Sequence, residues 1–152
     1  MVRNIFLMCL VLLLLVMQYH GALTIAGTSP NILLVVALAV AIGGASVGML
    51  TLSLIVILGG GMLFSTFWLV ELLTLITIVV LVKIFIRPIT GNSYVDFLII
   101  VIAATIMFTI FARIPFGTPV NVWVLIKEII YNGIIALISW PLVRRLAQTS
   151  ST

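Results

Sequence analysis

Residues 120–145, with the sequence VNVWVLIKEIIYNGIIALISWPLVRR, decide the fold class of this chain. The stretch is apolar and exceeds the ~20 residues that a helix needs to cross a ~30 Å hydrocarbon core. It nevertheless carries Lys127 and Glu128 side by side, followed by Asn132. Charged groups inside a membrane span are costly, so they face other helices, pair with each other or line a functional path. The stretch therefore predicts a transmembrane helix whose polar side chains contact neighbouring helices.

The composition of the whole chain predicts an integral membrane protein of the all-α class. Of its 152 residues, 64% are hydrophobic and 7% are charged, whereas roughly a quarter are charged in soluble domains. The long apolar runs lack the alternation of an outer-membrane barrel. The net charge is +4, but the basic residues are spread over spans and loops, which sets orientation rather than nucleic-acid binding. Cys9 is the only cysteine, which excludes an intramolecular disulfide.

Turn-forming residues divide the chain into six predicted spans within one domain, residues 1–147. Ser29 is a candidate N-cap of the second span, and Pro30 suits its first helical turn. Glycine clusters and proline-containing loops separate the later spans. We expect residues 148–152 to form a disordered tail. The predicted spans are 4–23, 31–42, 46–64, 68–85, 94–111 and 122–143.

The distribution of charge favours six spans. The alternative is five spans, which would result if residues 59–61 did not interrupt a helix. With six spans both termini lie on one side of the membrane, and most basic residues lie there too. The positive-inside rule makes that side the cytoplasm. The basic residues on it are Arg3, Lys83, Arg87, Arg144 and Arg145. Tryptophans near the predicted span ends, Trp68, Trp123 and Trp140, indicate an aromatic belt.

This topology brings four charged residues to a similar depth near the outer face, namely Glu71, Arg113, Lys127 and Glu128. Adjacent helix residues point about 100° apart, so Lys127 and Glu128 each need a partner on another helix. Glu71 with Lys127 and Glu128 with Arg113 is one arrangement, and the exchanged pairing is the other. Structural pairs, contacts to a partner protein and a substrate or proton path all remain open as roles for this cluster.

Uncharged polar and small residues indicate helix contacts. Asn132 and Tyr131 lie near the middle of the last span and are expected to form hydrogen bonds between helices. Gly44 and Gly48 form a small-xxx-small pair for packing of the second span on the third, with homodimerisation as the alternative. We find no set of residues typical of a catalytic, metal or cofactor site, so we expect a protein that is not an enzyme.

Two stretches carry a resemblance to a known family. Residues 29–34, SPNILL, resemble the proline-plus-Asp/Asn start of the second span in the MreD family of rod shape-determining proteins. Tyr131-Asn132, and residues 139–142, SWPL, before Arg144-Arg145, resemble that family's final helix. The family's Asp after the third span has no counterpart in residues 59–64, and no site is carried over from that motif.

The resemblance implies a multi-pass protein of the bacterial cytoplasmic (inner) membrane. Its implied function is to scaffold the cell-shape machinery that elongates sidewall peptidoglycan. The implied partners are membrane lipid, a single-span MreC-like protein and the cell-wall synthases. The alternative function is the substrate-binding S component of an energy-coupling-factor vitamin transporter, which is also a small six-span protein.

Overall fold

The computed structural model describes residues 30–42, 68–85, 89–113 and 119–148, and also 13, 16–18, 20, 24, 27, 28 and 117. For residues 68 and 142–148 it describes the helical backbone only. The described elements are all α-helices, as the composition predicts. They are α2 (Ile32–Ile42), α4 (Trp68–Phe85), α5 (Ser93–Arg113) and α6 (Val122–Gln148). The expected third span, including Gly44 and Gly48, lies outside the described residues, and so does most of the first.

The helix bounds agree with the predicted spans except at the C-terminus. α4 has the predicted bounds, and α5 is longer than predicted by one residue at its start and two at its end. α6 continues beyond the predicted span to Gln148, so the helix reaches the first residue of the predicted tail. Pro141 lies inside α6. Proline lacks the N–H that would bond to the carbonyl four residues earlier, Leu137 here, but its fixed φ is helical.

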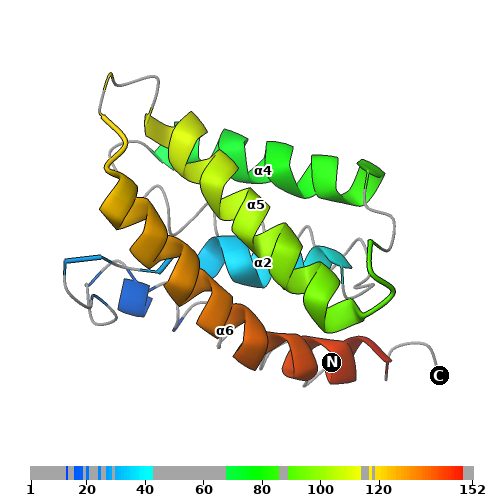
Figure 1. The fold of residues 1–152 in the computed structure, drawn as a ribbon. Coiled ribbons are helices and arrows are strands. Elements are labelled where there is room, and N and C mark those ends of the chain that lie inside the picture. Colours follow the sequence, from blue (N-terminus) through cyan, green and yellow to red (C-terminus); the bar gives the residue numbers. More distant parts are fainter. Residues whose placement is uncertain are drawn as a thin grey trace.

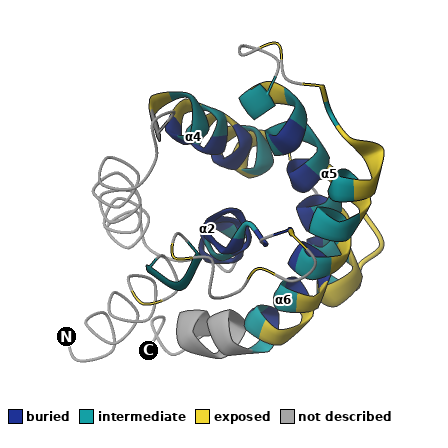
Figure 2. Ribbon diagram, turned by 90° about the vertical axis from the view of Figure 1, so that its left-hand side faces the viewer, coloured by how far each residue is buried: buried dark blue, intermediate teal, exposed yellow. Residues whose placement is uncertain are grey.

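α2 lies at the centre of the described helices, and α4, α5 and α6 surround it (Figure 1, Figure 2). It contacts all three, and α5 also contacts both α4 and α6, whereas α4 and α6 do not contact each other. Nine of the 11 residues of α2 are buried, as expected for a helix that is apolar on every side. Its described length is about 16 Å at ~1.5 Å per residue. That is about half of the ~30 Å core, so this part of the expected second span does not reach across a membrane.

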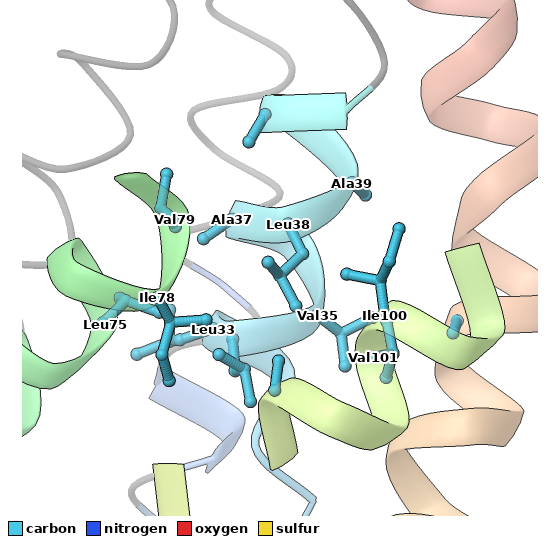
Figure 3. Close-up of a cluster of buried hydrophobic side chains, with 14 of the residues drawn as sticks. Leu33, Val35, Ala37, Leu38, Ala39, Leu75, Ile78, Val79, Ile100 and Val101 are labelled. Carbon is cyan, nitrogen blue, oxygen red and sulfur yellow. The ribbon is translucent and has the colours of Figure 1, made fainter. Parts of the chain in front are cut away.

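The apolar core is built around α2 (Figure 3). On one side Leu33 lies against Leu75 and Ile78 of α4. On the other side Val35 lies towards Val101 of α5. Side chains of α4 and of α5 therefore pack on opposite sides of α2. The central helix connects the two outer helices in this way.

Asparagine starts three of the helices. Asn31, Asn92 and Asn121 each directly precede a helix, and each side-chain oxygen accepts a backbone N–H from the first turn, which is the geometry of an N-cap. The donors are Leu34, Tyr94 and Trp123, at 3.1, 3.0 and 2.9 Å, respectively. The prediction that Ser29 is the N-cap of α2 is therefore wrong, because Asn31 is the cap. Pro30 precedes the cap, and Ser29 lies outside the described residues.

Two helices are long and apolar enough to cross a membrane, α5 and residues Val122–Pro141 of α6. Their outward faces carry large apolar side chains, and so does that of α4. On α6 these side chains recur every three or four residues, which places them on one face of the helix. The most exposed of them are Leu69, Leu73, Val80, Ile84 and Phe85 on α4, Val95 and Phe111 on α5, and Val122, Trp123, Ile130, Ile134, Leu137 and Ile138 on α6.

Candidate functional site in the seam between α5 and α6

The inner faces of α5 and α6 meet in a regular antiparallel seam, which we call the α5–α6 seam. Residues spaced four apart lie along one side of a helix, and each helix contributes one such row. Three levels of the seam are joined by two hydrogen bonds and one aromatic stack, and at the remaining level Val101 and Ala136 are both buried in the core. The rows are Thr109, Thr105, Val101 and Phe97 on α5, opposite Glu128, Asn132, Ala136 and Trp140 on α6.

Asn132 is the central polar residue of the seam, and its side chain is completely buried. Its Nδ2 donates to Thr105 Oγ1 at 2.9 Å. Its Oδ1 accepts the backbone N–H of Asn31 at 2.8 Å. The Thr105 hydroxyl in turn donates to the carbonyl of Val101 at 2.8 Å. One amide group therefore joins α6 to α5 and to the start of α2.

The buried start of α2 explains why Asn132 is needed there. The first N–H groups of a helix have no partner inside the helix, and a buried N–H without a partner costs about 1–3 kcal/mol. Asn31 satisfies only the N–H of Leu34. Gln18 Oε1 accepts the N–H groups of Ile32 and Leu33, at 3.0 and 3.4 Å. With Asn132 on the N–H of Asn31, every donor at this helix start has a partner.

Glu128 occupies the polar end of the seam. Its Oε2 accepts the hydroxyl of Thr109 at 2.8 Å, and its Oε1 lies 3.2 Å from Arg113 Nη2. The side chains of Arg113 and Glu128 are 31% and 18% exposed. A pair in this position retains some solvation, so it escapes part of the desolvation cost of full burial. This is one of the two pairings that the sequence left open.

Glu71 and Lys127 lie at the same end of the helices as this pair (Figure 1). Glu71 is in the first turn of α4, and Lys127 precedes Glu128 on α6; both are half-buried. Because α4 and α6 do not contact each other, the fold does not bring these two residues together as neighbours. Arg113 and Glu128 therefore form an ion pair, whereas Glu71 and Lys127 lie on two helices that do not contact each other. Tyr131 is half-buried beside Asn132.

Trp140 closes the seam at its other end. Its ring stacks on Phe97 with centroids 4.6 Å apart and an angle of 21° between planes. The side chain is 4% exposed, so the prediction that Trp140 belongs to an interfacial belt is wrong. Within the described part of the chain its indole N–H has no hydrogen-bond partner. Trp123 is 73% exposed, and the side chain of Trp68 lies outside the described residues.

Comparisons of the chain with protein-family models, with curated proteins and with solved structures find no match. A functional assignment therefore depends on the residues and contacts of this chain alone.

The chemistry of the α5–α6 seam is that of helix association. Its hydroxyls, its amide and its ion pair bond to one another or to the backbone. In the described part of the chain no three His, Cys, Asp or Glu residues are placed to hold a metal ion. Sequence reasoning identified Asn132, Arg113 and Glu128 but missed Gln18, Thr105, Thr109 and Phe97. The two threonines could have been predicted from their spacing. They are four residues apart on one helix, which matches the spacing of Glu128 and Asn132 on the next.

Proposed function

We propose that this chain is a non-catalytic, multi-pass protein of the bacterial cytoplasmic membrane that scaffolds partner proteins of the cell-shape machinery, as members of the MreD family do. The observation that carries the proposal is the contact between the two stretches that resemble that family. The start of α2 contributes Asn31 and the final helix contributes Asn132, and the two residues share a 2.8 Å hydrogen bond. Motifs about a hundred residues apart in the chain thus belong to one structural unit.

The outward faces of the helices support a role in binding through the membrane. The exposed faces of α4 and α6 consist largely of Leu, Ile and Val side chains. Helix association in lipid depends on close packing and on a few polar contacts rather than on a hydrophobic driving force. Such faces can contact lipid or the transmembrane helix of a partner. No acid–base pair directed at a pocket is needed for this role.

The lengths and directions of the helices support a multi-pass topology. α5 and α6 are each long enough to cross the membrane, and they run in opposite directions. α4 has 18 residues, or about 27 Å at ~1.5 Å per residue. In the proposed six-span arrangement, with both termini in the cytoplasm as the basic residues favour, these three helices are joined by the span that contains α2 and by two further spans predicted in the remaining sequence.

Depletion of the chain in its source bacterium tests the proposal. We expect rod-shaped cells to become wide and round, because sidewall synthesis loses its scaffold. A wild-type copy should restore the rods, whereas an Asn132→Leu copy should not. The tagged wild-type protein should also co-purify in mild detergent with a single-span cell-wall protein. Depleted cells that keep a normal width would refute the proposal, and so would a purified protein that carries a stoichiometric vitamin and no cell-wall partner.

A further inference from the structure

The N-terminal part of the chain has the sequence pattern of a secretory signal peptide. Arg3 provides a basic start, residues 5–17 are all apolar, and Thr24-Ile25-Ala26 is a candidate cleavage site that ends in a small residue. As a helix, the uninterrupted apolar run would be about 20 Å long, which is short of the ~30 Å hydrocarbon core. The pattern alone therefore fits a peptide that is removed from the mature protein as well as it fits a first span.

The contacts of Gln18 connect this segment to the centre of the fold. Its Oε1 accepts the backbone N–H groups of Ile32 and Leu33, at 3.0 and 3.4 Å. Ile32 and Leu33 are 3% and 6% exposed, so little water reaches these N–H groups. A buried N–H that loses its acceptor destabilises the fold. Removal of the segment would therefore leave two donors at the start of α2 without the acceptor that the structure gives them.

The described residues on either side of Gln18 place it close to the end of a helical stretch. Val16 is helical and half-buried, and its carbonyl accepts the N–H of His20 at 3.0 Å. Thr24, in the candidate cleavage site, and Gly27, which directly follows that site, are both exposed. Gly27 has a φ of +76°, which glycine adopts readily in a turn. The part of the chain before the candidate site thus contributes contacts to the core, whereas the site itself lies at the surface.

We infer that residues 5–18 are a signal-type sequence that stays in the mature protein, where Gln18 binds the start of α2. Apolar helix faces gain little by associating in lipid, so the two hydrogen bonds of Gln18 make this contact specific. The inference rests on the membrane placement in the proposed function and adds to it the fate of the N-terminal segment. The segment then has two tasks: it directs the chain into the membrane, and it completes the buried start of α2.

The intact mass of the protein tests whether the segment is retained. The full-length chain with a C-terminal tag is extracted from membranes in mild detergent, and its mass is measured. We expect a mass that includes residues 5–18. Any chain that starts after Gln18, for example at Gly27, would overturn the inference. Alkaline extraction separates the two proposals. A chain that is released from membranes refutes the membrane placement itself, whereas a chain that stays in membranes but starts at Gly27 refutes only the retention of the segment.

A cleavable turn tests the role of Gln18. The recognition site of a specific protease is inserted after Gly27, and the purified protein is cut in detergent. We expect residues 1–27 to remain bound to the rest of the chain during gel filtration. Gln18→Leu removes both hydrogen bonds and should raise the dissociated fraction roughly tenfold. Gln18→Glu keeps an acceptor oxygen at a helix start, where a negative group is favourable, and should hold the fragment as the wild type does.

The matched control is Met17→Leu, which changes the apolar neighbour of Gln18 and keeps both hydrogen bonds. It should also hold the fragment as the wild type does. Dissociation of the wild-type fragment on cleavage would overturn the inference, and so would equal retention by Gln18→Leu and the wild type.

Discussion

The α5–α6 seam and the contact between α4 and α5 hold similar helices together by different means. In the α5–α6 seam, two polar levels and one aromatic stack align residues spaced four apart on both helices. Between α4 and α5 the contact is apolar and leaves a groove of about 350 Å³. The first interface is closed and depends on oriented hydrogen bonds, whereas the second is apolar and leaves an open groove.

The difference shows what fixes register when the surroundings are apolar. Apolar side chains lose little when one helix slides along another in lipid, because the lipid is as apolar as the neighbouring helix. A hydrogen bond such as that of Asn132 to Thr105 is satisfied at one register only. The α5–α6 seam therefore sets the position of the helices, and α4 is held through α2 and through shape.

The largest expected effect comes from Asn132→Leu, which keeps the branched shape and the number of side-chain heavy atoms but leaves the part-buried N–H of Asn31 without an acceptor. We expect a loss of about 2 kcal/mol in the free energy of unfolding. It should be measured by unfolding the protein in mixed detergent and SDS. The matched change in the other interface, Ile78→Val, should cost about 1 kcal/mol. If Asn132→Leu were the less damaging of the two, the amide would not be what fixes the register.

The next effect is the coupling between Arg113 and Glu128. A double-mutant cycle with Arg113→Gln and Glu128→Gln should give about 1 kcal/mol, because the pair is half-buried and 3.2 Å apart. The same cycle on Glu71 and Lys127 is the control, and it should give a coupling near zero, because α4 and α6 do not contact each other. A larger coupling for Glu71 with Lys127 would show that the charges pair across α4 and α6 instead.

Gly133 tests how closely α5 and α6 approach. A Cβ at this position would lie 3.5 Å from Leu98 Cδ1, which is an ordinary contact. Gly133→Ala should therefore raise the free energy of unfolding by about 0.5 kcal/mol, because Gly is a poor helix former. Gly133→Leu should lower it, because a longer side chain meets Leu98. Thermal denaturation in detergent distinguishes these outcomes, and a loss on Gly133→Ala would mean that the helices approach more closely than the structure describes.

The smallest effects are expected on the outward faces. Ile84→Leu on α4 and Ile134→Leu on α6 change exposed side chains without changing their polarity. Each should alter the free energy of unfolding by less than about 0.5 kcal/mol. A larger loss measured in detergent for only one of them would identify that face as part of an intermolecular contact.

The sequence predicted the helices well because their signals are local. Apolar length and the proline-containing loops are read from neighbouring residues, and the bounds of α4 agree with the prediction. Trp140 was placed wrongly because an aromatic residue near a basic helix end has the same local pattern at an interface and in a core. Only Phe97, 43 residues earlier in the chain and stacked on its ring, distinguishes the two positions.

The sequence by itself determined that the chain is helical and apolar, and that its polar residues near residue 130 must contact other helices. The tertiary structure decided which partners these residues have. Gln18 and Asn132 are far apart in the chain, yet both complete the buried start of α2. The physical reason is that the cost of an unsatisfied buried group is fixed by its chemistry, whereas the partner that removes the cost is fixed by how distant helices pack.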